Sequence, residues 1–119
     1  MSKDPIIIAG AARTPVGGFQ GSLATASASK LGAIAISAAV ERSGIKSDYI
    51  DEVIMGCVLS AGQGQAPARQ AALSAGLSLN AGCTTVNKMC GSGMKSVMLA
   101  HDMIIAGTGR TIVAGGQES

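Results

Sequence analysis

Four short runs of strand-forming residues alternate along the chain with three segments of helical length, and this alternation restricts the possible folds more than any other feature. The strand-like runs cover residues 5–9, 52–59, 83–88 and 111–114, and the helical segments cover residues 30–42, 68–75 and 91–106. Strands that are largely apolar along their length are typical of a sheet covered on both faces. The order βαβαβαβ therefore predicts an α/β fold, with a parallel or mixed sheet layered with helices.

Glycine, serine and proline mark the ends of these segments. Ser27 or Ser29 is expected to cap the first helix, and Pro67 suits the first turn of the second. Gly44 and Gly107 are expected to end the first and third helices. Because no linker, repeat or low-complexity segment divides the chain, residues 1–119 are predicted to form one domain.

Composition excludes several classes of function. The net charge is only +2, Lys and Arg do not cluster, and Phe19 and Tyr49 are the only aromatic residues, which argues against nucleic-acid binding. The sequence contains no apolar run of the roughly 18 residues that a membrane span needs. The first residues lack the pattern of a secretory signal, so we expect a cytoplasmic protein.

The cysteines indicate thiol chemistry and not metal binding. The chain has three cysteines, Cys57, Cys83 and Cys90, which is an odd number, and no two of them form a CxxC pair. His101 is the only histidine of the sequence. This pattern fits neither a zinc site nor a disulfide framework. We therefore expect free thiols and no metal.

Cys90 lies where a strand-like run gives way to the third helix, and it is either a buried inert thiol or a nucleophile. The free N–H groups and the dipole of a helix N-terminus favour an anion such as a thiolate. Gly91 and Gly93 carry no side chains that would crowd the sulfur, so a substrate carbonyl could approach both the thiol and a backbone N–H. A nucleophile usually needs a base, but His101 is eleven residues further along and about three helical turns away.

Four stretches of the chain resemble the thiolase family, in particular its acetyl-CoA acetyltransferases. They are IIIAGAARTPVGGFQGSL, VLSAGQGQAPARQAAL, VNKMCGSGMKSVMLA and IVAGGQES, in this order and spread over almost the whole chain. The resemblance places Cys90 on the acyl-accepting cysteine of the family. It implies the layered thiolase fold, of which this chain would be the N-terminal part.

The resemblance also implies a reaction and its substrates. The Cys90 thiolate would be acylated by an acyl-CoA, and the Cys90 N–H would line an oxyanion hole. The acyl group would then pass to coenzyme A in thiolytic cleavage, or to a second acetyl-CoA in a Claisen condensation that gives acetoacetyl-CoA. Coenzyme A and acetyl-CoA are thus expected as substrates, with no permanently bound cofactor, in the setting of fatty acid metabolism.

Thiolases are homo-oligomers, and the resemblance implies that the strand before Cys90 takes part in self-association. The residues expected to support this interface and the catalytic turn are Gln65, Arg69, Thr85, Val86 and Asn87. Two positions depart from the family pattern: Gln117 stands where GGMES is usual, and Ala66 stands where Asn usually precedes the proline.

The family segments that carry the activating histidine, the second cysteine and part of an oxyanion site have no counterpart here. We therefore expect a chain that holds the nucleophile but is not competent alone. The alternative is a non-catalytic, self-associating assembly module derived from a thiolase half. A related condensing enzyme of the ketoacyl synthase type fits less well, because the residues around Cys90 are those of thiolases.

Overall fold

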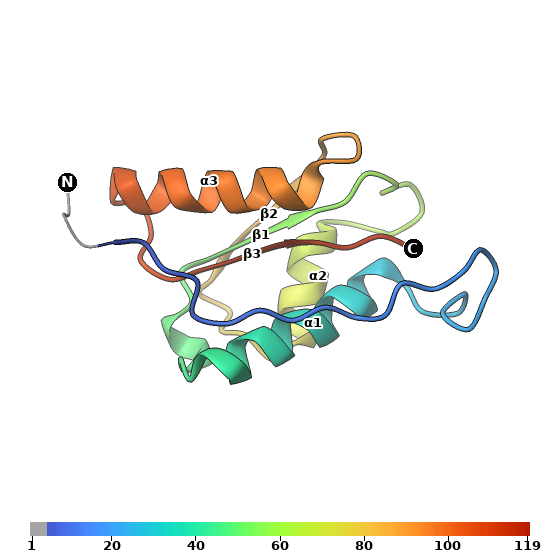
Figure 1. Ribbon diagram of the computed structural model, residues 1–119, viewed down its shortest axis with the longest axis horizontal. Helices are drawn as coiled ribbons and strands as arrows, with labels where there is room; N and C mark the ends of the chain where they lie inside the picture. The colour runs from blue at the N-terminus through green and yellow to red at the C-terminus, as the bar shows by residue number, and fades with distance from the viewer. Residues whose placement is uncertain (1–4) are drawn as a thin grey trace.

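A central sheet separates two layers of helices in the structure, a computed structural model that describes residues 5–119 (Figure 1). Its strands are β1 (Glu52–Gly56), β2 (Gly82–Val86) and β3 (Ile112–Gly116), and its helices are α1 (Ala28–Ser43), α2 (Pro67–Ser74) and α3 (Ser92–Ala106), with a short 3₁₀-helix, η1 (Ser47–Tyr49). Helix α3 covers one face of the sheet and contacts β1 and β3. Helices α1 and α2 pack together on the other face.

The strands run parallel in the order β2-β1-β3. Val53 in the central strand pairs with Cys83 of β2 and with Val113 of β3. Each connection between consecutive strands contains a helix, as parallel neighbours require. The predicted α/β fold with a parallel sheet layered with helices is confirmed.

The central strand is buried on both faces. Val53, Ile54 and Met55 are 0%, 3% and 2% exposed, although their side chains point alternately to opposite faces. Ala68 and Ala71 of α2 are also fully covered, and such small side chains let this helix lie close to the sheet. Both aromatic side chains are exposed, so the core is aliphatic, as the composition requires.

The strand predicted at residues 5–9 is not formed. The segment is extended but runs past helix α1 without joining the sheet, and Ile7 and Ile8 are 74% and 81% exposed (Figure 1). Arg42 of α1 donates to the carbonyl of Ala11 at 2.8 Å. Gly10 also packs against the backbone of α1, where a Cβ would come within 2.5 Å of a carbonyl oxygen. The residues have strand composition, but no strand of the described chain pairs with them.

Strand β1 ends at Gly56, earlier than the predicted end at residue 59, because the amides of Val58 and Leu59 bond outside the sheet. The N–H groups of Val58 and Leu59 donate to the carboxylate of Glu118, at 3.0 Å and 2.6 Å. Side-chain acceptors of this kind take the place of a neighbouring strand and turn the chain into a loop. The other predicted segments agree with the structure to within two residues at each end.

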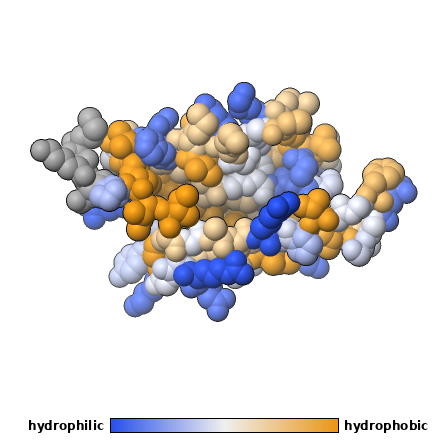
Figure 2. All heavy atoms as spheres, in the orientation of Figure 1, coloured by the Kyte–Doolittle hydropathy of each residue, from blue (hydrophilic) through white to orange (hydrophobic). Residues whose placement is uncertain are grey.

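Helix α3 is apolar on its outer face as well as on the face that covers the sheet. Met94, Val97 and Met98 are 75%, 47% and 53% exposed. Apolar surface is also visible along the N-terminal segment on the face shown in Figure 2. Within the described part of the chain, no helix has the length and hydrophobicity to span a membrane.

Adding a methyl group at Gly56 should destabilise the fold, since its Cβ would lie 2.5 Å from the carbonyl carbon of Ser92 in α3. We expect Gly56→Ala to lower the free energy of unfolding by about 1–3 kcal/mol, measured by urea denaturation. Gly115→Ala is the matched control, because its Cβ would meet only the flexible end of Met55, at 3.4 Å. Equal losses in the two variants would contradict the close packing of α3 on β1.

Asp51 links the start of β1 to the start of β3 through hydrogen bonds, and it should make the free energy of unfolding depend on pH in the acidic range. Its carboxylate accepts from the N–H groups of Arg110 at 2.8 Å and Thr111 at 3.2 Å, and these hydrogen bonds lower its pKa below the usual 3.8. The folded pKa is thus below the unfolded one, so the contribution is present above about pH 4 and is lost as the pH falls through the folded pKa.

We expect Asp51→Asn to weaken the loss of stability between about pH 5 and pH 2, measured by thermal unfolding. Arg110→Ala is the control, because it keeps the backbone N–H that has the largest effect on the Asp51 pKa. If the pH dependence of stability is weakened as much in Arg110→Ala as in Asp51→Asn, then the Arg110 guanidinium, and not the backbone N–H groups, lowers the pKa of Asp51.

Candidate active site

The loops that follow the three strands meet at one end of the sheet (Figure 1). They are residues 57–66 after β1, residues 87–91 after β2 and residues 117–119 after β3. Ligands of open parallel sheets bind outside the carboxyl ends of the strands. Cys90 lies in the second of these loops, so the sheet brings it to the end of the molecule where a substrate is expected.

Cys90 occupies a strained position in a tight turn. The N–H of Gly91 donates to the carbonyl of Lys88 at 2.7 Å, which closes a four-residue turn with Cys90 at its third position. Cys90 has φ 57°, a left-handed conformation that usually requires glycine at this place in a turn. Such a residue costs of order 1–3 kcal/mol and is found most often at functional sites. The Cys90 side chain is nevertheless exposed.

The two glycines after Cys90 have different surroundings. Gly91 is the N-cap of α3 and provides no side chain to cap it, so the first turn of the helix opens next to Cys90. Gly93 lies against β3, where an added Cβ would be 3.5 Å from the N atom of Gly116. Gly91 thus borders the thiol, whereas Gly93 lets α3 approach the sheet.

The residues expected to support the turn connect β2 to its neighbours. The hydroxyl of Thr85 accepts from the N–H of Ala68 at 3.0 Å and so caps helix α2, whose own N-cap residue makes no such bond. The carbonyl of Val86 accepts from the N–H of Cys57, and the amide of Asn87 donates to the carbonyl of Val58 at 3.4 Å. These bonds tie the strand before Cys90 to α2 and to the loop after β1.

Gln65 and Arg69, also expected to support the site, are both exposed. The carbonyl of Gln65 accepts from the side chain of Gln70 at 2.7 Å. Arg69 lies beside Cys83, where burial raises the pKa of the thiol and the guanidinium acts in the opposite direction. The structure therefore links Arg69 to the cysteine of β2, and Gln65 to the start of α2.

Two residues of this region were not found by sequence reasoning. Glu118 bridges the ends of β3 and β1 through its bonds to Val58 and Leu59. The side chain of Gln63 donates to the sulfur of Cys57 at 3.3 Å and to the carbonyl of Leu59, which folds the loop after β1 back on itself. Glu118 stands in one of the motifs that resemble thiolases, but nothing in the sequence indicates which backbone groups it binds.

His101 is not placed to act on Cys90. It lies in α3, about 14 Å beyond Ser92 along the helix axis, since a helix rises about 1.5 Å per residue. Its Nδ1 is 3.1 Å from Oδ1 of Asp102, and both side chains are exposed. Among residues 5–119, no three His, Cys, Asp or Glu side chains form a group that could hold a metal ion.

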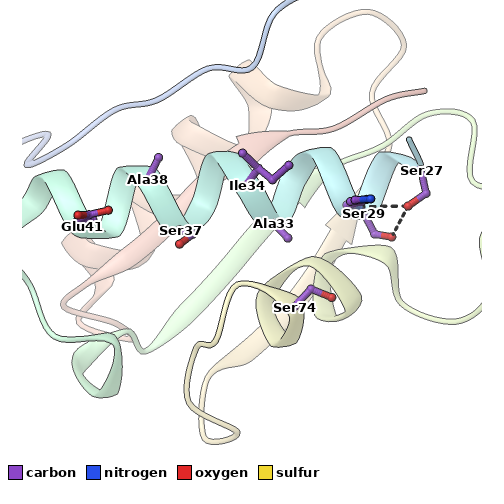
Figure 3. Close-up of a pocket in the computed structure, with 9 residues that line it drawn as sticks. Ser27, Ser29, Ala33, Ile34, Ser37, Ala38, Glu41 and Ser74 are labelled. Carbon is purple, nitrogen blue, oxygen red and sulfur yellow. Dashed lines mark hydrogen bonds between the residues drawn. The ribbon is translucent and has the colours of Figure 1, made fainter. Parts of the chain in front are cut away.

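A groove lies along α1, with Ser74 of α2 on its other side (Figure 3). It is polar at one end, where Ser27 caps α1 by accepting from the N–H of Lys30 at 3.2 Å. Its lining residues are Ser27, Ser29, Lys30, Ala33, Ile34, Ser37, Ala38, Glu41 and Ser74. None of the residues predicted for the site borders this groove.

Comparison with known proteins identifies the family of the chain. A family model described as the thiolase N-terminal domain matches residues 6–119. The chain belongs to the thiolase family. The curated relatives include a mitochondrial acetyl-CoA acetyltransferase of Xenopus tropicalis, 60% identical over 96% of this chain, and an acetyl-CoA acetyltransferase of Cupriavidus necator, 56% identical over 96%.

A solved thiolase has the same fold. Acat5 thiolase from Ascaris suum, in complex with coenzyme A, superposes with a TM-score of 0.92 and 40% sequence identity over 94% of this chain. The thiolase chain described here spans 27% and 29% of the two curated relatives and 29% of the Ascaris chain.

Both departures of this thiolase chain from the family pattern lie next to Pro67. Ala66 is the N-cap of α2 and has φ 48°, a conformation that asparagine tolerates better than alanine. Gln117 is buried, and its side chain donates to the carbonyl of Pro67 at 3.3 Å. It lies so close to Gly32 of α1 that a Cβ there would overlap it. Gln117 thus fills the space between α1 and the start of α2, away from the Cys90 turn.

The three thiols of this thiolase chain should differ strongly in reactivity. Cys57 is 1% exposed and burial raises its pKa; burial also raises the pKa of the partly buried Cys83, whereas Cys90 is exposed. Since the thiolate is the reactive form, we expect iodoacetamide to label Cys90 first and Cys57 last, at least about tenfold more slowly. Peptide mass spectrometry measures the three rates, and unfolding in denaturant should make them similar. Native Cys57 reacting as fast as Cys90 would contradict the structure.

Proposed function

We propose that this chain is the nucleophile-bearing part of an acetyl-CoA acetyltransferase, with Cys90 as the acyl acceptor. The observation that carries the proposal is an exposed cysteine in a strained turn, directly before a helix N-terminus and at the carboxyl end of a parallel sheet. The names of the relatives support acetyl transfer as the reaction.

In the proposed reaction, the Cys90 thiolate attacks a carbonyl carbon of the substrate, and a bond forms from sulfur to that carbon. With acetyl-CoA as the donor, the bond to the sulfur of coenzyme A breaks and the coenzyme A thiolate leaves. With a 3-ketoacyl-CoA, the attack is on the 3-keto carbon, the bond between C2 and C3 breaks, and the acetyl-CoA carbanion leaves and takes up a proton. The acyl group on Cys90 then passes to coenzyme A, which completes thiolytic cleavage, or to the carbanion of a second acetyl-CoA, which completes Claisen condensation; either transfer releases the Cys90 thiolate. Backbone N–H groups at the turn, including that of Cys90, would stabilise the oxyanion.

Coenzyme A enters this reaction as a substrate and not as a bound cofactor. Support comes from the Ascaris thiolase, which was solved in complex with coenzyme A. The exposure of Cys90 fits a thioester that arrives from solvent and leaves again.

The proton acceptor is proposed to lie outside this chain. Among residues 5–119 the only histidine is His101, well along α3 and next to Asp102. We therefore propose that acylation of Cys90 can occur in this chain, and that complete turnover needs a base supplied by another polypeptide segment.

A cytoplasmic location also stays a proposal, and the Xenopus relative is named as mitochondrial.

A second candidate function is a non-catalytic module that assembles through the sheet edge. β2 is an edge strand of the described sheet, and its residues are partly exposed. Edge strands present unpaired backbone groups that can pair with another chain. Homo-oligomerisation through β2 is proposed under both candidate functions, so oligomeric state alone does not distinguish them.

Incubation with acetyl-CoA distinguishes the two functions. We expect one acetyl group to add at Cys90 as a thioester that hydroxylamine removes, detected by intact and peptide mass spectrometry. Cys90→Ser should lower this acetylation by more than about 100-fold, because serine without an adjacent base is a far weaker nucleophile. Cys83→Ser is the control and should be acetylated like the unchanged chain.

Absence of any Cys90 adduct, in a chain that still associates through β2, would favour the assembly module. Sedimentation analysis of Cys90→Ser provides this second measurement, since the substitution lies outside the strand.

A further inference from the structure

Ser92, the first residue of α3, makes two hydrogen bonds to a single residue of the Cys90 turn. Its hydroxyl accepts from the N–H of Lys88 and donates to the carbonyl of Lys88, both at 2.9 Å. The side chain is only 7% exposed, so water competes poorly for these bonds.

These bonds act on the turn that holds Cys90 in its left-handed conformation. Lys88 is the first residue of that turn, and its carbonyl also accepts the N–H of Gly91, which closes the turn. Because Ser92 binds both backbone polar groups of Lys88, movement of Lys88 out of the turn breaks two part-buried hydrogen bonds. A cysteine at φ 57° would otherwise relax to negative φ, where L-residues are more stable.

Ser92 is itself held by the sheet. Gly56 of β1 packs directly against it, without space for a Cβ. The Cys90 turn is therefore fixed to the central strand through one side chain.

We propose that Ser92 is a positioning residue for the nucleophile: its hydroxyl keeps the turn of residues 88–91 closed and so holds the Cys90 thiol exposed at the start of α3. The inference rests on the proposed function only in taking Cys90 as the acyl acceptor. The hydroxyl does not touch the sulfur in this role and takes no proton from it.

The test compares the rate of Cys90 alkylation by iodoacetamide in three variants. Ser92→Ala should slow alkylation by about tenfold, since it removes both bonds to Lys88. Ser96→Ala is the matched control: it also deletes a buried hydroxyl of α3, 0% exposed, but one that donates to the Ser92 carbonyl within the helix and makes no bond to Lys88. Its Cys90 alkylation rate should stay within about twofold of the unchanged chain, because both bonds from the Ser92 hydroxyl to Lys88 remain. Ser92→Thr keeps a hydroxyl and should recover most of the rate.

Cys57 in the same samples reports general loosening, because it is buried and becomes accessible only when the fold opens. An unchanged Cys90 rate in Ser92→Ala, or an equal loss in Ser96→Ala, overturns the proposal. If Ser92→Ala does not fold, amide hydrogen exchange of the unchanged chain decides the question. The Lys88 N–H should then exchange at least about 100-fold more slowly than an unprotected amide, and exchange without protection overturns the proposal.

Failure of this inference differs from failure of the proposed function. A Cys90 that alkylates rapidly in every variant leaves acetyl transfer possible but removes the role of Ser92. A Cys90 that alkylates rapidly and depends on Ser92, yet never accepts an acetyl group from acetyl-CoA, keeps the positioning role and contradicts the acetyltransferase.

Discussion

The close contact between Gly56 and Ser92 sets the distance between the central strand and helix α3, and the arrangement of the candidate site depends on it. β1 has a paired neighbour on each side and is buried on both faces, so its position is fixed by the whole sheet. Because α3 touches β1 at its first residue, the N-terminus of the helix is fixed as well. The turn that carries Cys90, residues 88–91, leads directly into this fixed helix start. An exposed loop can therefore hold a strained conformation.

At the same end of the sheet, hydrogen bonds outside the regular strand pairing connect the loops that follow the strands. The Glu118 carboxylate accepts from two backbone amides of the loop after β1, and the backbone N–H of Gln117 donates to the carbonyl of Gly56 at 2.8 Å. Asn87 links the loop after β2 to the loop after β1. The three loops thus support one another at the end of the sheet where the Cys90 turn lies.

The three paired strands of the sheet could be predicted from the sequence, but which further segments join the sheet could not. Buried strands such as β1 were visible because a strand covered on both faces is apolar throughout, and the helices because of their caps. Residues 5–9 have the same composition but no partner strand in the described chain, and pairing is a long-range property that local sequence does not contain. Cys90 was predicted as a candidate nucleophile because it precedes a glycine-rich helix start and matches the acyl-accepting cysteine of thiolases, and the structure shows it exposed.

The roles of Ser92 and Glu118 could not be predicted, for a related reason. Each acts through backbone groups whose position depends on the folded loop: Lys88 for Ser92, and the amides of Val58 and Leu59 for Glu118. The positive φ of Cys90 was equally hidden, since cysteine carries no preference for it. A serine next to a glycine gives no sign in the sequence that it closes a turn four residues earlier.

The difference in exposure among the three cysteines follows from the place of each relative to the sheet. Cys57 directly follows the central strand and is buried, and burial is the main cause that raises the pKa of its thiol. Cys83 lies inside the edge strand, where burial again raises the pKa more than Arg69 lowers it. Cys90 lies beyond the end of its strand, in a turn that no neighbouring strand covers. A thiol placed there meets solvent and substrate without any change in the core, so its position can be set by a few hydrogen bonds while the other two stay protected by packing.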